Sequence, residues 1–167
     1  MISQEENIQD IAANEIMSLF IDVHTIMMLT APDITGMQEA KIRLLGLLEM
    51  TGSQSMTELC NQMFISKPYM TRLVDSLVSE GSVERHPDVK DRRVINISMT
   101  EKGKEYLCNM LMELRNRMKS FLSEFSSTDL ETISKVSAEL HRTIAKNPRV
   151  KNQGTWSFYN AQNLKEK

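Results

Sequence analysis

The segment from residue 81 to residue 103 constrains the fold more than any other part of the chain, because it predicts a β-hairpin. Residues 83–85 can form one short strand. In residues 94–99 apolar side chains occupy alternate positions, which is typical of a strand with one buried face. A hairpin that buries one face must pack on other elements, so the helices around it are the next constraint.

The loop of this hairpin carries a concentration of positive charge. Residues 86–88 supply turn chemistry, and Lys90, Arg92 and Arg93 crowd the end of the loop. A structural turn does not need this density of cations, so the loop is expected to face an anionic partner. The alternative is a solvated charged turn in which the two loop aspartates pair with Lys90 and Arg92.

Two helices with defined ends precede the hairpin. One is predicted to begin at an N-cap, Ser66, and to end at Gly81 in a left-handed C-cap conformation. A shorter helix over residues 56–63 opens with capping-box spacing between Ser55 and Glu58. Helix, tight turn, helix and hairpin together predict a winged helix-turn-helix.

From about residue 38 to residue 103 the chain resembles the MarR family of winged-helix transcription regulators. Residues 85–93 match the family's Asp-x-Arg wing, and residues 99–103 match its Leu-Thr-Glu-Lys-Gly start of the next helix, with Met99 in place of Leu. Outside this run the resemblance rests on helix order and length and extends from about residue 8 to residue 146. The last twenty residues have no counterpart that we identify in the family.

The expected fold is therefore mainly α with a small β-hairpin wing (α+β), a winged helix-turn-helix with N- and C-terminal dimerisation helices. We expect four segments. They are an N-terminal dimerisation helix (1–34), a winged helix-turn-helix DNA-binding domain (35–99), C-terminal dimerisation helices (100–147) and a C-terminal tail (148–167).

The dimer rests on long helices with apolar stripes at the two ends of the chain. They are predicted over residues 5–30, over residues 100–126, and from a Thr128–Glu131 capping box to the region before Pro148. The resemblance implies that these helices interlock in a two-fold homodimer. A monomeric helical bundle is the alternative.

The formal net charge of −2 is unevenly distributed along the chain. Residues 1–63 carry two basic and nine acidic groups (−7), residues 64–104 carry eight and six (+2), and residues 105–167 carry ten and seven (+3). The positive groups thus lie with the wing and the tail, while the N-terminal third repels phosphate. We expect DNA affinity that depends on dimerisation and falls with added salt.

The resemblance and the charge make double-stranded DNA the expected partner. On the helix after Ser66, five side chains lie off the apolar stripe: Lys67, Tyr69, Thr71, Arg72 and Ser76. Arg72 is expected to read a base in the major groove, whereas the side chains at the helix start, including Ser66, suit phosphate.

In the wing, the family's Asp-x-Arg pattern falls on Asp91 and Arg93. We expect Arg93 to enter the minor groove, Asp91 to orient it, and Arg92 to contact the DNA backbone together with Lys90.

The resemblance also implies a crevice for a small-molecule effector beside the second helix, predicted from a Thr35–Gln38 cap to Gly52. The candidates to line it are His24, Met27, Met28, Arg43 and Met110. The alternative is that the methionines are ordinary core side chains and that the histidine is a satisfied interior or surface group.

An enzyme is not expected, because the three histidines form no local catalytic pattern and no phosphate-binding glycine loop occurs. We expect no cofactor and no metal, and we read Cys60 and Cys108 as reduced structural thiols. No apolar run approaches the length needed to cross a membrane, and the acidic start lacks a signal-peptide core. The chain is therefore expected in the cytoplasm without a membrane partner.

The tail adds one expectation, that Trp156 and Phe158 dock on the dimer helices; a disordered tail is the alternative. Two other functions of the same fold remain open, a winged-helix protein-interaction module and a redox- or metal-responsive sensor.

Overall fold

The computed structural model describes residues 4–89 and 91–151. The chain divides into two compact units, Met1–Ile34 and Thr35–Lys167, which we describe separately. The division falls at the end of the predicted first segment.

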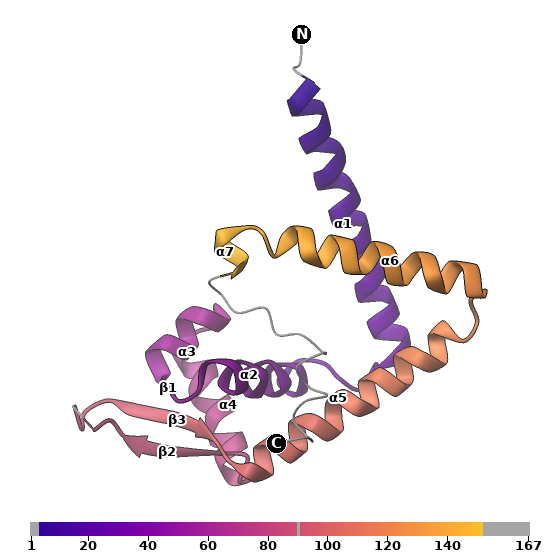
Figure 1. Cartoon of the computed structure of the whole chain (residues 1–167). Helices are drawn as coiled ribbons and strands as arrows, with labels where there is room; N and C mark the ends of the chain where they lie inside the picture. Colours follow the sequence, from indigo (N-terminus) through magenta and orange to yellow (C-terminus); the bar gives the residue numbers. More distant parts are fainter. Residues whose placement is uncertain (1–3, 90, 152–167) are drawn as a thin grey trace. The chain divides into compact units, whose positions relative to one another are not determined.

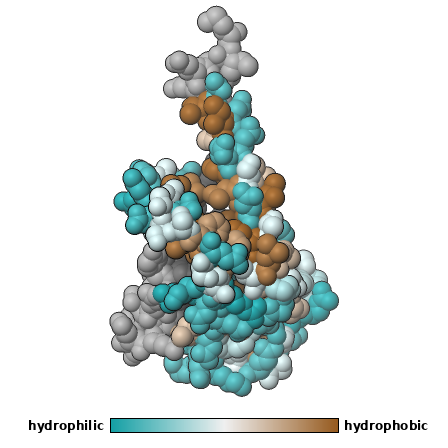
Figure 2. Space-filling model, turned by 90° about the vertical axis from the view of Figure 1, so that its right-hand side faces the viewer, coloured by the Kyte–Doolittle hydropathy of each residue, from teal (hydrophilic) through white to brown (hydrophobic). Residues whose placement is uncertain are grey.

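The first unit is one long helix, α1 (Gln4–Thr30), and agrees with the predicted range to within one residue. Its apolar side chains are exposed, with Phe20 at 67%, Ile21 at 60% and Leu29 at 70%. The apolar brown surface along this helix is visible in Figure 2. Phe20 belongs to the predicted stripe, whereas Ile21 and Leu29 lie outside it, so exposed apolar side chains occupy more than one side of the helix.

One sequence expectation is wrong here. The part of α1 from Asn7 to Thr30, 24 residues long, is long and apolar enough to cross a membrane by length and composition alone. The sequence reading missed it because Glu15 and Asp22 interrupt the apolar run while the mean hydropathy stays high. Core helices of soluble proteins pass the same test, so the finding assigns no membrane role.

The second unit contains the sheet and most helices (Figure 1). Its elements are α2 (Met37–Thr51), β1 (Gln54–Ser55), α3 (Met56–Met63), α4 (Lys67–Ser79), β2 (Val83–Pro87), β3 (Ile95–Met99), α5 (Glu101–Leu122), α6 (Ser127–Ile144) and α7 (Pro148–Lys151). This arrangement confirms the predicted fold class.

The sheet is antiparallel with strand order β1-β3-β2. His86 pairs with Asn96 and Pro87 with Ile95. Two of the three residues expected in the turn therefore belong to β2, which is longer than the predicted strand. The two-residue strand β1 was not predicted, because its periodicity is too short to detect; Gln54 pairs with Ile97. Among the alternating residues of β3 only Ile97 is fully buried.

A single core joins the sheet to four helices of the second unit. The most deeply buried apolar side chains come from α2, α3, α4, β3 and α5: Leu44, Leu45, Leu59, Met70, Leu73, Val74, Leu77, Ile97 and Leu107. Three- and four-residue spacing in α4 places its four buried residues on one side, and that side fixes the orientation of the opposite face.

Two predicted helix ends are confirmed. The hydroxyl of Ser55 accepts the Glu58 N–H at 3.3 Å and the Glu58 carboxylate accepts the Ser55 N–H at 2.8 Å, which completes the capping box. At the end of α4, Gly81 has φ +72°, and the N–H of Ser82 donates to the carbonyl of Leu77 at 2.8 Å. This is a Schellman ending, which a left-handed glycine permits.

Three other predicted ends are wrong. Gly36, with φ +54°, precedes α2, so the helix begins after it and Thr35 is not the cap. Ser126 caps α6 by accepting the Asp129 N–H, two residues before the expected Thr128 cap. The long helix α5 ends at Leu122 rather than about residue 126.

The described part of the tail begins with the short helix α7. Pro148, expected to break helical structure, opens α7 instead, where its missing N–H costs little. The predicted docking of Trp156 and Phe158 concerns positions outside the described residues.

Candidate nucleic-acid interface

The exposed face of α4 is set by the core on its other side. Lys67, Thr71 and Arg72 are exposed, and Asp75 continues the same face one turn later. The hydroxyl of Thr71 donates to the Lys67 carbonyl at 2.9 Å, so its methyl group is the part free to contact a partner. This face has the width and composition of a helix that can enter a major groove.

Arg72 lies against a neighbouring aromatic ring. Its guanidinium carbon is 5.7 Å from the centroid of the half-buried Tyr69 ring, within cation–π range. Ser66 is the N-cap residue of α4 by conformation, but its hydroxyl accepts no N–H of the helix and is exposed. The start of α4 therefore offers a restrained guanidinium, a phenol and a hydroxyl at one place.

Ser76 is placed differently from the other predicted contacts. It is half-buried, and its hydroxyl donates to the Glu80 carboxylate at 3.0 Å. The same carboxylate forms an ion pair with Lys41 of α2, whose side chain is 12% exposed. Ser76 is therefore part of a polar network that connects α4 to α2, and it does not belong to the exposed face of α4.

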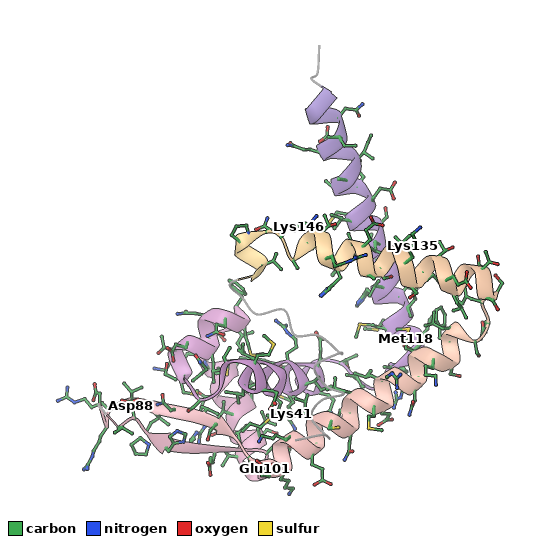
Figure 3. The ribbon with its side chains drawn as sticks, viewed as in Figure 1. Lys41, Asp88, Glu101, Met118, Lys135 and Lys146 are labelled. Atoms are coloured by element: carbon green, nitrogen blue, oxygen red, sulfur yellow. The ribbon has the colours of Figure 1, made fainter. Side chains whose placement is uncertain are left out.

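The wing loop is held by a chain of hydrogen bonds. The N–H of Asp88 donates to the Val94 carbonyl at 2.9 Å, and Val94 donates to the Asp91 carbonyl at 2.9 Å. The Asp88 carboxylate accepts the Asp91 N–H and the Asn96 side-chain amide, each at 3.0 Å. Asp88 lies at the closed end of the hairpin (Figure 3). These bonds define the loop before any partner arrives.

Asp91, Arg92 and Arg93 are all exposed on this loop. The Asp91 carboxylate accepts the backbone N–H of Arg93 at 3.0 Å, so it fixes the main chain from which the arginine side chain extends. The sequence reading had assigned Asp91 to orienting Arg93, and this bond is one way to do so. Lys90 falls outside the described residues.

The sequence reading missed the ion pair that joins the two parts of the site. Arg85 of β2 lies 2.6 Å from the Asp75 carboxylate of α4. Helical and strand periodicity place Asp75 and Arg85 at exposed positions of α4 and β2, but they do not show that the two side chains meet. The pair links the wing to α4 on the exposed side of the molecule, while Val83 and Ile97 of the hairpin join the core that α4 also contributes to.

Among the depressions in the described part of the second unit, two lie beside α2. The first, about 440 Å³, is here named the α2–α4 depression and is lined by Gly36, Glu39, Ala40, Arg43, Met63, Ile65, Ser66, Tyr69 and Arg72. The second, about 420 Å³, is named the α2–α5 depression and is lined by Gln38, Lys41, Glu80, Ser82, Lys102 and Tyr106.

The predicted effector residues do not gather in one place within the second unit. Met110 is half-buried on α5, and its sulfur accepts from the Gln38 amide at 3.9 Å. Arg43 is exposed in the α2–α4 depression, about 140° around α2 from Gln38. On α1, His24, Met27 and Met28 are exposed.

The thiols lie apart in the second unit. Cys60 of α3 is half-buried and Cys108 of α5 is buried. Within residues 4–89 and 91–151, no group of three histidine, cysteine or acidic side chains is arranged to hold a metal ion.

Comparison with known proteins identifies the same region. The sequence profile of the MarR family matches residues 35–94. The transcriptional repressor MprA of Escherichia coli strain K12 is 29% identical over 107 residues, a match that spans 63% of this chain and 61% of MprA. The HTH-type transcriptional repressor MdtR of Bacillus subtilis strain 168 is 26% identical over 113 residues, which are 68% of this chain and 73% of MdtR.

A solved structure supports the fold over a longer range. The YusO protein from Bacillus subtilis superposes with a TM-score of 0.61 at 24% identity and covers 84% of this chain and 98% of its own. The relatives named as regulators belong to a non-enzymatic class, in agreement with the sequence expectation. The winged helix-turn-helix, its wing motif and these matches agree, and residues 35–94 match the MarR family.

Proposed function

We propose that this protein is a sequence-specific DNA-binding regulator of transcription, most simply a repressor, that works as a homodimer in the cytoplasm. The observation that carries the proposal is the ion pair between Asp75 and Arg85. It couples the exposed face of α4 to the wing, so that Arg72 and Arg93 project from one connected element. The repressor names of MprA and MdtR support the same reading.

The roles within this interface follow from position. We assign base reading to Arg72 and Thr71, phosphate contact to Ser66, Lys67 and Tyr69, and a supporting role to Ser76 through Glu80. In the wing, Arg93 is assigned to the minor groove, Arg92 and Lys90 to the DNA backbone, and Asp91 to holding the Arg93 main chain.

A homodimer is supported by the terminal helices. Large apolar side chains of α1 and α6 are exposed, including Phe20 at 67% and Val136 at 57%. A single chain leaves this surface in water, whereas a two-fold interface would bury it. Two recognition helices in such a dimer would lie roughly 34 Å apart and read a pseudo-palindromic site.

Response to a small effector is the second part of the proposal. The α2–α5 depression touches the helix that carries Lys41, the end of α4 at Glu80 and the start of α5 at Lys102. An anion bound there would compete with Glu80 for Lys41 and could displace α4. Met110 lies near its Gln38 edge, while His24, Met27 and Met28 stay candidates on α1.

The proposal is tested by selecting duplexes from a random pool at about 150 mM salt and measuring their affinity by fluorescence anisotropy. We expect an enriched pseudo-palindrome that binds at least about a thousandfold more tightly than a scrambled duplex. Retention of no duplex at this salt would favour the protein-interaction alternative. Protection of one half-site alone would contradict the dimer.

A further inference from the structure

We propose that the α2–α4 depression seats one phosphate of the DNA backbone and that Arg43 clamps it. The inference rests on the proposed function and adds a contact from α2, outside the recognition helix and the wing. It moves Arg43 from the group of effector candidates to the DNA-binding surface.

The depression has a rigid floor. Its walls come from α2, from the turn between α3 and α4, and from the first turns of α4. Ala40 and Met63 at its base are 9% and 5% exposed and belong to the core. On α2, Leu44 and Leu45 directly follow Arg43 and are fully buried, so the backbone that carries the guanidinium cannot shift freely.

The rim of the depression is cationic. Arg43 and Arg72 supply two guanidiniums, and Glu39 is the one acidic residue among those that line it. Neither arginine forms an ion pair with a carboxylate in the described part of the chain. The Ser66 hydroxyl and the Tyr69 phenol add hydrogen-bond donors at the same rim. An anion with several acceptor oxygens satisfies this set, and a guanidinium binds phosphate through two parallel bonds.

The position of Arg43 favours the DNA backbone over a base. Arg43 belongs to α2, whereas the face of α4 that can enter a groove carries Thr71 and Arg72. When α4 lies in a major groove, a side chain on the helix behind its N-terminal end meets the strand at the groove edge. The apolar side chain of Ile65, which lines the same depression as Arg43, offers a surface for a deoxyribose face.

This contact would set the depth at which α4 enters the groove, without reading sequence. Removing it should therefore weaken specific and non-specific duplexes by the same factor. This expectation separates Arg43 from Arg72, whose loss should act at one base pair.

The test compares the parent protein with Arg43→Ala and Arg43→Lys on the selected operator and on a scrambled duplex over a salt series. We expect Arg43→Ala to weaken both about tenfold and to reduce the salt slope by about 1.8, that is about 0.9 for the phosphate contacted by each of the two chains of the homodimer. Arg43→Lys should recover part of the loss. Glu39→Gln, which removes the only carboxylate of the rim, should strengthen both duplexes. Lys135→Gln, which removes an exposed charge on α6 (Figure 3), is the matched control and should change neither.

A methylphosphonate scan locates the phosphate. Each phosphate of a half-site is replaced in turn by a neutral methylphosphonate. We expect one position at which the parent protein loses about tenfold in affinity and Arg43→Ala loses nothing further. Parental binding by Arg43→Ala, or a loss confined to one base pair, would overturn the inference. If the parent protein itself retains no duplex, the proposed function fails first.

Discussion

The winged helix-turn-helix together with the start of α5, here called the winged domain, differs from the terminal helices in how much apolar surface it buries. In the winged domain, Leu44, Leu73 and Ile97 are fully buried in a core made by one chain. In α1 none of the side chains described from residue 7 to residue 30 is buried. The difference is that the core of the winged domain forms from the residues of one chain, whereas the apolar side chains of α1 have no core of their own.

In the winged domain, the backbone at the start of α5 lies close to the backbone of the turn between α4 and β2. The Thr100 hydroxyl donates to the Gly81 carbonyl at 2.7 Å, and the Thr100 N–H donates to the Ser82 carbonyl at 3.1 Å. These bonds bring the first turn of α5 onto the turn between α4 and β2. At Gly103 only a hydrogen fits, because a Cβ atom there would lie 2.1 Å from the Ser82 carbonyl oxygen.

Gly103→Ala is the substitution expected to destabilise the winged domain. The added methyl group would also lie 2.9 Å from the Met99 side chain, so α5 must move and the core contact of Leu107 opens. We expect a loss of about 3 kcal/mol in the free energy of unfolding, at the upper end for overpacking. Urea unfolding measures it, with Glu105→Ala at an exposed position of α5 as the control. An unchanged midpoint would show that the turn yields easily.

Phe20→Asp tests the other side of the comparison. If a second chain covers α1, burying a charge in place of this ring should weaken self-association at least about thirtyfold, since a buried Phe contributes about 2 kcal/mol. Sedimentation equilibrium measures the change. Phe64→Asp is the matched control, because Phe64 is 79% exposed on the winged domain. Equal effects of the two substitutions would remove the distinction between the regions.

Arg93→Ala should separate function from stability within the winged domain. We expect operator affinity to fall by more than tenfold and the salt slope to become shallower, while the free energy of unfolding changes by less than about 0.5 kcal/mol, because the side chain is exposed. Asp91→Ala should be milder, since it removes only the carboxylate that accepts the Arg93 N–H. Anisotropy at several salt concentrations decides between these outcomes. Parental affinity in Arg93→Ala would exclude the wing from DNA binding.

The sequence was most informative where local chemistry determines structure. The Ser55–Glu58 box, the Gly81 ending and the core side of α4 depend on residues within one or two turns, and all three were predicted. The end of β2 was misjudged, because Pro87 normally indicates a turn but has no strand partner on its outer side here.

Contacts between elements distant in sequence were not predictable in the same way. The Lys41–Glu80 pair and the Asp75–Arg85 pair depend on how α2, α4 and β2 are packed, which periodicity alone does not give. The α2–α4 depression is a further case, since the helical pattern of α2 predicts an exposed Arg43 but not that it shares a depression with Tyr69 of α4.

The smallest expected effect compares two caps of the same chemistry in the two kinds of region. The Ser55 hydroxyl and then its backbone N–H bond the Glu58 carboxylate, and they hold its pKa below the ordinary 4.5. The Ser126 hydroxyl caps α6 by accepting the Asp129 N–H and donating to the Asp129 carboxylate. Ser55→Ala should cost about 1 kcal/mol in the cooperative unfolding of the winged domain, whereas Ser126→Ala should cost that unfolding much less, because α6 has no buried residue.

The pH dependence follows from the lowered pKa of Glu58. A carboxyl group whose pKa is lower when folded stabilises the fold above its unfolded pKa, and this contribution is lost as pH falls through the folded pKa. The cost of Ser55→Ala should therefore be full at pH 7 and shrink below about pH 4.5, where the carboxylate takes up a proton. Urea unfolding of the parent protein and both serine variants at several pH values measures this. If the cost of Ser55→Ala stays constant down to pH 3, the stabilisation comes only from the hydrogen bond that the Glu58 N–H donates to the Ser55 hydroxyl.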